Sequence, residues 1–147
     1  MIEGIKKLRD QTGLSVVDIR RALEEAGGDE KRALEILGSR GHEIAEKKSS
    51  RLAKEGVVES YIHANKKVGA IIVLHCETDF VAKSLDFLEL AHDLAMQIAS
   101  MNPKGAGELL EQPFIKDQNS TIRELINKHI AKLGENIKVG EFSRFNV

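Results

Sequence analysis

The stretch that decides the fold is Val68-Gly69-Ala70-Ile71-Ile72-Val73-Leu74-His75-Cys76. It is rich in β-branched and aliphatic residues, which is typical of a strand. Successive side chains of a strand point to opposite faces, and here residues 70, 72 and 74 are apolar on one face while 71 and 73 are apolar on the other. We therefore expect both faces of the sheet that holds this strand to be buried.

Two further segments are expected to pair with this strand. Val57 to His63 has strand character, and the polar run Ala64-Asn65-Lys66-Lys67 between the two strands favours a hairpin. Ile137 to Val147 at the end of the chain is typical of a closing strand. Together they predict a small antiparallel sheet.

Two amphipathic helices follow the hairpin. Leu85 to Met101 is expected to begin after the cap residue Ser84 and to end at Asn102-Pro103, and Thr121 to Leu133 is expected to end at Gly134. Their apolar stripes hold Leu88, Ala91, Leu94 or Ala95, and Ile98 in the first helix and Ile122, Leu125, Ile126, Ile130 and Leu133 in the second. Residues 103–118 between them show no pattern that assigns a structure.

These helices can cover only one face of the sheet. The other face would leave aliphatic side chains in water, which monomers seldom do over a large patch. We therefore predict a homodimer in which a two-fold axis joins the same sheet face of two protomers.

The N-terminal part is predicted to be a three-helix bundle. Ile2, Ile5 and Leu8 mark a first helix that stops at Thr12-Gly13. Ser15 and Asp18 resemble a capping box for a second helix, whose apolar face holds Val16, Ile19, Ala22, Leu23 and Ala26 and which ends at Gly27-Gly28. Asp29 caps a third helix, which buries Ala33, Leu34 and Leu37 before Gly38 and Gly41.

A polar, basic segment from Glu43 to Lys54 is interpreted as a connecting helix. Its basic residues Lys47, Lys48, Arg51 and Lys54 suit either a site for phosphate or an acidic partner, or a solvated face, and the second interpretation is favoured. The fold class is therefore α+β, with a helical docking domain and connecting helix in residues 1–50 and a two-layer core in residues 51–147.

Composition excludes several classes of protein. The 147-residue chain has a formal net charge of −1, which argues against direct nucleic-acid binding through a basic surface. No apolar stretch is long enough to span a bilayer, and the single Cys76 excludes an intrachain disulfide, so we expect a cytoplasmic protein with no membrane partner. With no Trp and one Tyr, the core must be aliphatic.

Residues that could carry chemistry are sparse. The sequence has no Gly-Lys-Ser/Thr phosphate loop, so we expect no bound nucleotide. His63, His75 and His92 could form a metal or acid–base cluster, but ordinary half-buried histidines are the favoured interpretation. Cys76 and His75 are adjacent in a strand and face opposite ways, so they cannot form a catalytic dyad. No metal, no cofactor and no enzymatic activity are expected.

The most informative segment is Glu77-Thr78-Asp79-Phe80-Val81-Ala82, at the corner between a strand and a helix. From the residue types alone, Asp79 would cap a helical turn and Phe80 would fill the core. A partner-binding role for both residues is the alternative.

Several separated motifs together resemble the elongation factor Ts family. They are Leu8-Arg9-Asp10-Gln11-Thr12-Gly13, the run from Arg21 to Asp29, Ala53-Lys54-Glu55-Gly56, the segment from Glu77 to Ala82, and Gly134-Glu135-Asn136-Ile137 leading to Phe142-Ser143-Arg144-Phe145. The likeness covers nearly the whole chain. Leu14-Ser15 departs from the family's usual Ala-Gly, and the second core subdomain of long members is missing.

The resemblance implies a guanine-nucleotide exchange factor that promotes GDP release from elongation factor Tu during translation. It implies a ubiquitin-associated-like (UBA-like) N-terminal domain that docks on the GTPase through Leu8, Arg9, Thr12 and Gly13. It also implies that Thr78, Asp79, Phe80 and Val81 enter the GTPase near its magnesium site and displace the ion.

Two other hypotheses stay open at this point. The chain could be a UBA-like binding adaptor for ubiquitin-like or nascent-chain ligands, without exchange activity. It could also be a thiol or metal enzyme that uses Cys76 and the histidines, although their spacing gives this little support.

Overall fold

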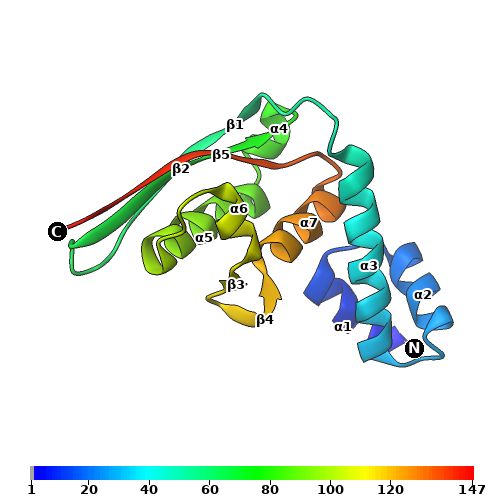
Figure 1. The fold of residues 1–147 in the computed structure, drawn as a ribbon. Helices are drawn as coiled ribbons and strands as arrows, with labels where there is room; N and C mark the ends of the chain where they lie inside the picture. The colour runs from blue at the N-terminus through cyan, green and yellow to red at the C-terminus, as the bar shows by residue number, and fades with distance from the viewer. Residues whose placement is uncertain (1) are drawn as a thin grey trace.

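The computed structural model describes residues 2–147, and Figure 1 shows their arrangement. The elements are α1 (Ile2–Thr12), α2 (Val16–Glu25), α3 (Glu30–Lys48), β1 (Glu55–Ile62), β2 (Val68–Cys76), α4 (Asp79–Ala82), α5 (Leu85–Met101), α6 (Ala106–Glu111), β3 (Pro113–Phe114), β4 (Asp117–Thr121), α7 (Ile122–Leu133) and β5 (Lys138–Asn146). Helices α1 to α3 precede an α+β part with an antiparallel sheet, which confirms the predicted fold class.

The first three helices enclose a small core of their own. The buried side chains are Leu8, Ile19, Ala22, Leu23, Ala26, Ala33 and Leu37. Ser15 caps α2 by accepting from the backbone N–H of Asp18 at 3.1 Å, but the Asp18 carboxylate accepts from the Ser15 hydroxyl, so the reciprocal half of the capping box is not formed. The predicted burial of two residues is wrong: the side chains of Ile2 and Leu34 are exposed, because they point away from the core that the three helices share.

Helix α3 corrects the predicted connecting helix. It passes through Gly38 and Gly41 without a break and ends at Lys48, so residues 43–54 do not form a separate helix. Gly41 is buried against α7, where a side-chain β-carbon would lie 3.7 Å from that of Ala131. Close packing of α3 on α7 offsets the low helix propensity of glycine.

The three-stranded sheet has the order β1-β2-β5, and all its pairs are antiparallel. Val57 lies opposite Leu74 in one pair, and Ile72 lies opposite Phe142 in the other. The stretch from Val68 to Cys76 is thus the central strand. The predicted hairpin and closing strand are confirmed.

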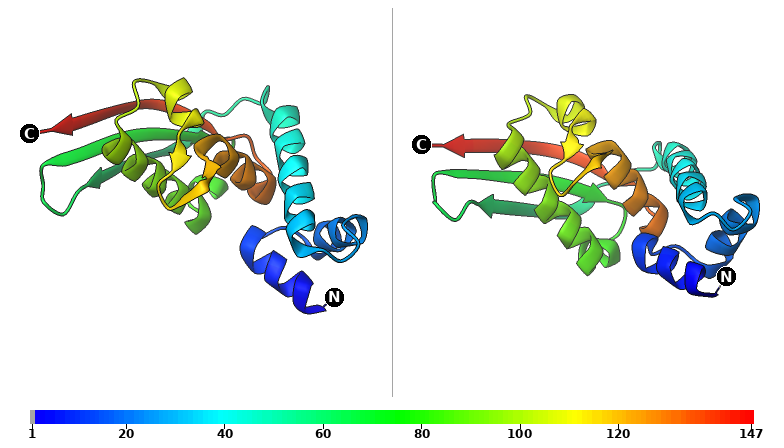
Figure 2. Two further views of the ribbon diagram at one scale, coloured as in Figure 1. Left: turned by 60° about the horizontal axis from the view of Figure 1, so that its bottom comes forward. Right: turned by 90° about the horizontal axis from the view of Figure 1, so that it is seen from below.

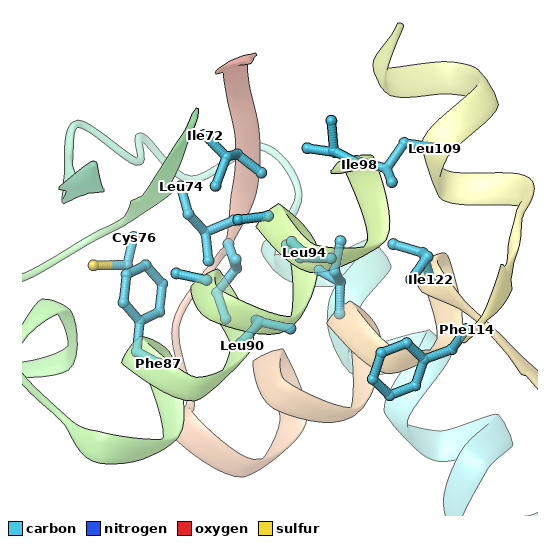
Figure 3. Close-up of a cluster of buried hydrophobic side chains, with 14 of the residues drawn as sticks. Ile72, Leu74, Cys76, Phe87, Leu90, Leu94, Ile98, Leu109, Phe114 and Ile122 are labelled. Carbon is cyan, nitrogen blue, oxygen red and sulfur yellow. The ribbon is translucent and has the colours of Figure 1, made fainter. Parts of the chain in front are cut away.

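Helix α5 covers one face of the sheet, and α7 packs beneath it (Figure 3). This larger core contains Ile72, Leu74, Phe87, Leu90 and Leu94 at its centre. Both helix predictions agree with the observed bounds to within one residue. Ser84 caps α5, and a full capping box of Thr121 and Glu124 begins α7.

The other face of the sheet is open, so the expectation that both faces are buried is wrong for a single chain. Figure 1 shows the sheet edge-on with α5, α6 and α7 on one side. Val58, Ile62, Ile71 and Phe145 are exposed on the opposite side. We call these four residues the open sheet face.

The unassigned residues 103–118 form α6, β3 and the first two residues of β4. The buried side chain of Gln97 holds this segment to α5. Its amide nitrogen donates to the Pro113 carbonyl at 3.0 Å, and its oxygen accepts from the Ile115 N–H at 2.9 Å. One polar side chain from another helix organises the segment, and that leaves no periodic signal in the sequence.

Candidate partner-binding surface

The segment Thr78–Val81 forms an outward-facing turn directly after the central strand. Thr78, rather than Asp79, caps α4 by accepting from the Val81 N–H at 3.3 Å. The turn is anchored by Val81, which packs on the larger core, and by buried Ala82. Phe80 points away and is 86% exposed, so the interpretation of Phe80 as a core residue is wrong.

Asp79 lies beside Phe80 on the same exposed turn. Its carboxylate pairs with Lys83 at 3.7 Å, one helical turn on, and both side chains are largely exposed. Exposed pairs of this kind are worth little, so the carboxylate is accessible to another cation. The turn therefore presents an aromatic ring and an acid side by side.

Glu135 holds this turn from the α7–β5 connection. Its Oε1 accepts from the backbone N–H groups of Glu77 at 3.0 Å and Thr78 at 2.9 Å, and its Oε2 accepts from the Thr78 hydroxyl at 2.6 Å. Hydrogen bonds to a charged acceptor are about twice as strong as neutral ones. Sequence reasoning placed Glu135 in a family motif but gave it no role, because its partners lie 57 and 58 residues away.

A second exposed apolar side chain near the turn was also missed. Leu85 follows the cap residue Ser84 and is 83% exposed. It lies in the first turn of α5, ahead of the buried stripe that begins with Phe87. Phe80 and Leu85, five positions apart, therefore both present large apolar side chains to solvent.

The four predicted N-terminal docking residues differ in exposure. Leu8 is fully buried, and Thr12 is buried with its hydroxyl donating to the Leu8 carbonyl at 2.7 Å. Arg9 and Gly13 are exposed. Of these residues, only Arg9 and Gly13 can touch a partner in this conformation, while Leu8 and Thr12 hold the shape of the surface.

Lys132 connects the N-terminal helices to α5. A β-carbon on Gly13, whose φ is +68°, would lie 2.3 Å from Cε of Lys132, so the lysine chain occupies the space beside the glycine. The Lys132 Nζ donates to the Asp86 carboxylate at 3.1 Å. The right panel of Figure 2 shows α1 beside the end of α7. Lys132 thus links Gly13 of one predicted binding segment to the start of α5, which follows the other segment along the chain.

The basic residues 47–54 do not share one helical face. Lys48 donates to the Gly134 carbonyl at 2.8 Å, and Arg51 lies 3.8 Å from the Glu77 carboxylate. Lys47 and Lys54 are exposed. Half of the run thus has a structural role.

Cys76 and the histidines form no reactive centre. Cys76 is fully buried and donates to the Thr78 carbonyl at 3.2 Å, and burial, with the nearby Glu135 charge, raises the pKa of its thiol to about 11. His63 bonds the Tyr61 hydroxyl at 2.9 Å, and His92 lies edge-on to the Tyr61 ring with centroids 5.7 Å apart. Residues 2–147 contain no cluster of three metal-binding side chains and no helix suited to crossing a bilayer.

Sequence comparisons with known proteins cover nearly the whole chain. The family model described as Elongation factor TS matches residues 29–105 and 77–147. Elongation factor Ts of Syntrophomonas wolfei is 38% identical, with 99% of this chain and 89% of the relative covered. Elongation factor Ts of Thermotoga petrophila is 38% identical over 97% of this chain and 94% of the relative, and that of Oleidesulfovibrio alaskensis is 38% identical over 97% and 95%.

This chain belongs to the elongation factor Ts family of translation factors. The alignment with the Syntrophomonas wolfei relative runs over 190 positions, and 190 minus 147 leaves at least 43 positions with no residue of this chain. The relatives therefore carry internal segments that this chain lacks.

Proposed function

We propose that this protein is a guanine-nucleotide exchange factor that promotes GDP release from elongation factor Tu, and that it acts in the cytoplasm. The observation that carries the proposal is the exposed Phe80 on a short turn that Thr78 caps and Glu135 holds. An exposed aromatic ring on a rigid support suits an anchor for a partner's apolar pocket. Family membership supplies the identity of that partner.

Exchange of this kind needs no covalent chemistry, so the protein is not an enzyme in the bond-breaking sense. Factor and GDP each weaken the other's hold on the GTPase, and linkage makes the effect reciprocal. In our proposal Phe80 enters a pocket of the GTPase, while Asp79 approaches the magnesium site and disturbs the contacts that hold ion and nucleotide. Thr78 and Val81 keep the turn in shape.

The helices of residues 1–50 are proposed as the docking module and residues 51–147 as the exchange domain. Arg9 and Gly13 lie on the surface, Gly13 beside Lys132 of α7, and both are proposed to contact the GTPase. Leu8 and Thr12 support them from within. This division of labour separates affinity, which comes from docking, from displacement of the nucleotide.

A homodimer is proposed through the open sheet face. Fully burying an aliphatic or aromatic side chain stabilises by about 1.5–3 kcal/mol, and Val58, Ile62, Ile71 and Phe145 offer four such side chains. A second copy brings the same patch and can cover it symmetrically.

The test is release of fluorescent GDP from elongation factor Tu with and without this protein. We expect acceleration that saturates with factor concentration, and no effect on GDP bound to an unrelated GTPase. Unchanged release together with tight binding to another protein ligand would instead support the UBA-like adaptor.

A further inference from the structure

We infer that residues 132–136, the last two residues of α7 and the three that follow it, form a joint that positions the Thr78–Val81 segment relative to the N-terminal docking module, with Glu135 as its central positioning residue. The inference rests on the proposed function, since it explains how the exchange segment is aimed.

The first arm of the joint grips the exchange segment. The Glu135 carboxylate uses both oxygens, accepting two backbone N–H groups and one hydroxyl from Glu77 and Thr78. These are the residues immediately before Asp79 and Phe80. Because these bonds fix the backbone at the start of α4, they set the direction in which the Phe80 side chain points.

A reciprocal bond closes the first arm. The Glu77 carboxylate, which is 19% exposed, accepts from the Asn136 backbone N–H at 3.0 Å. Glu77 and Glu135 thus each accept from the backbone of the other's segment, so the two segments are held together from both sides. Arg51, 3.8 Å from Glu77, offsets part of the negative charge.

The second arm holds the exit of α3. The buried side chain of Asn136 donates to the Arg51 carbonyl at 2.8 Å, and Lys48 donates to the Gly134 carbonyl at 2.8 Å. Helix α3 is continuous from the docking module to Lys48, so this arm fixes the module's longest helix.

The third arm reaches the docking turn itself. Lys132 lies against Gly13 and donates to Asp86 in the first turn of α5. Five consecutive residues therefore contact the exchange segment, the exit of α3, the docking turn and the start of α5.

The chemistry of the Glu135 bonds separates positioning from stability. Two of the three are exposed to solvent, so water can replace the carboxylate when it is removed. Neither hydrophobic core contains Glu135. Loss of the carboxylate is therefore expected to free the exchange segment while the fold persists.

The first experiment measures amide hydrogen exchange of Glu77 and Thr78 by NMR in the free protein. E135A should exchange these two amides at least about tenfold faster than wild type, with amides of β2 unchanged. E135Q, which keeps one neutral acceptor, should fall between them. Unchanged exchange rates of these two amides in both variants would show that Glu135 does not hold the segment. The measurement does not involve elongation factor Tu.

The second experiment measures GDP release from elongation factor Tu over a range of factor concentrations. E135A should lower the maximal release rate by about tenfold or more, while the half-saturating concentration changes less, because docking is retained. E111A, which removes an exposed carboxylate of α6 that pairs with Arg123 near the opposite end of α7, should leave both parameters unchanged. A maximal rate for E135A within about twofold of wild type would overturn the inference.

Coupling to the anchor completes the test. Substituting Phe80 by Ala should cost less in the E135A background than in wild type, because an anchor that is no longer aimed has less to lose. Strictly additive losses would count against positioning. If E135A fails to fold, the two readouts on E135Q decide. If the wild-type protein does not accelerate GDP release from elongation factor Tu, the proposed function fails. The amide measurement still tests whether Glu135 holds Glu77 and Thr78.

Discussion

The Phe80 side chain points into solvent from a turn that is held by hydrogen bonds of Thr78 and by the packing of Val81 and Ala82. Its ring contributes little to either core, so its removal should act on the partner rather than on the fold. We expect F80A to reduce GDP release from elongation factor Tu by roughly 30-fold, which corresponds to an anchor of about 2 kcal/mol. The change in free energy of unfolding should stay within about 0.5 kcal/mol.

Stimulated release and thermal melting check the two halves of this prediction. L52A is the matched control, since Leu52 is a similarly exposed apolar residue in a loop with no proposed partner contact. A variant that melts much lower but exchanges normally once folded would make Phe80 a structural residue.

His129 predicts a pH dependence of stability. Burial lowers the pKa of its imidazole below the ordinary 6.5, with the Leu125 carbonyl bond opposing the shift and Lys128 and Lys132 adding to it. The folded state therefore holds the neutral form. This contribution is present above about pH 6.5 and is lost as pH falls through the folded-state pKa, because the unfolded chain binds the proton first.

Urea unfolding near pH 7.5 and near pH 5 measures this effect. Wild type should lose more stability over that interval than H129L, which has no imidazole to titrate. Equal losses in the two proteins would show that His129 does not contribute.

At the residue scale, local signals could be predicted and distant ones could not. The cap Ser84 was predicted because its partner, the Phe87 N–H, lies three residues away. The turn that carries Phe80 is bonded by Glu135, which is remote in sequence, and residue type alone gave the wrong environment for Phe80. Leu8 and Thr12 show the reverse case, since buried residues sit within a motif expected to bind a partner.

Helix α3 shows why glycine misled the prediction of its end. Glycine costs about 1 kcal/mol in a helix interior relative to alanine, and two of them within four residues favour a stop. The contact with α7 is a tertiary effect that no local pattern reveals. The hairpin, the closing strand and helices α5 and α7 were predictable because each has a long run of apolar residues at regular spacing.

The same contact yields a graded prediction at Gly41. G41A should be neutral or stabilising by up to about 1 kcal/mol, since a methyl group meets Ala131 at an ordinary 3.7 Å. G41L should destabilise by about 1–3 kcal/mol, because its larger side chain must force α3 and α7 apart.

Chemical unfolding of both Gly41 variants checks this prediction. G38L serves as the matched control, because a side chain at Gly38 meets open space. A G41L protein as stable as G38L would contradict the close packing of α3 on α7.

The whole molecule exposes one sheet face that a second copy can cover. We expect light scattering at micromolar concentration to report about twice the chain mass. I71K should convert the dimer to a folded monomer, because a charge in the middle of the patch is costly to bury. V17K, at an exposed apolar residue of α2, is the matched control and should stay dimeric. A wild-type protein that is monomeric and still accelerates GDP release from elongation factor Tu would exclude the proposed dimer.

Removal of the docking module is a second prediction at this scale. A variant lacking residues 1–38 keeps Gly41 and Ala45, which pack on the larger core, and so should fold. It should bind elongation factor Tu weakly and show little or no stimulated release. Circular dichroism and titration calorimetry measure fold and affinity, and wild-type affinity in the truncated protein would remove the docking role of the first helices.

Tyr61 gives the molecule an optical property that follows from its packing. It is the only tyrosine in a chain without tryptophan, and its ring lies edge-on to His92 of α5 while its hydroxyl bonds His63 of the hairpin. Intrinsic tyrosine emission therefore reports from one point, where α5 meets the sheet. In a mixture with a tryptophan-containing partner, excitation selective for tryptophan leaves this protein dark, so every change in that signal belongs to the partner.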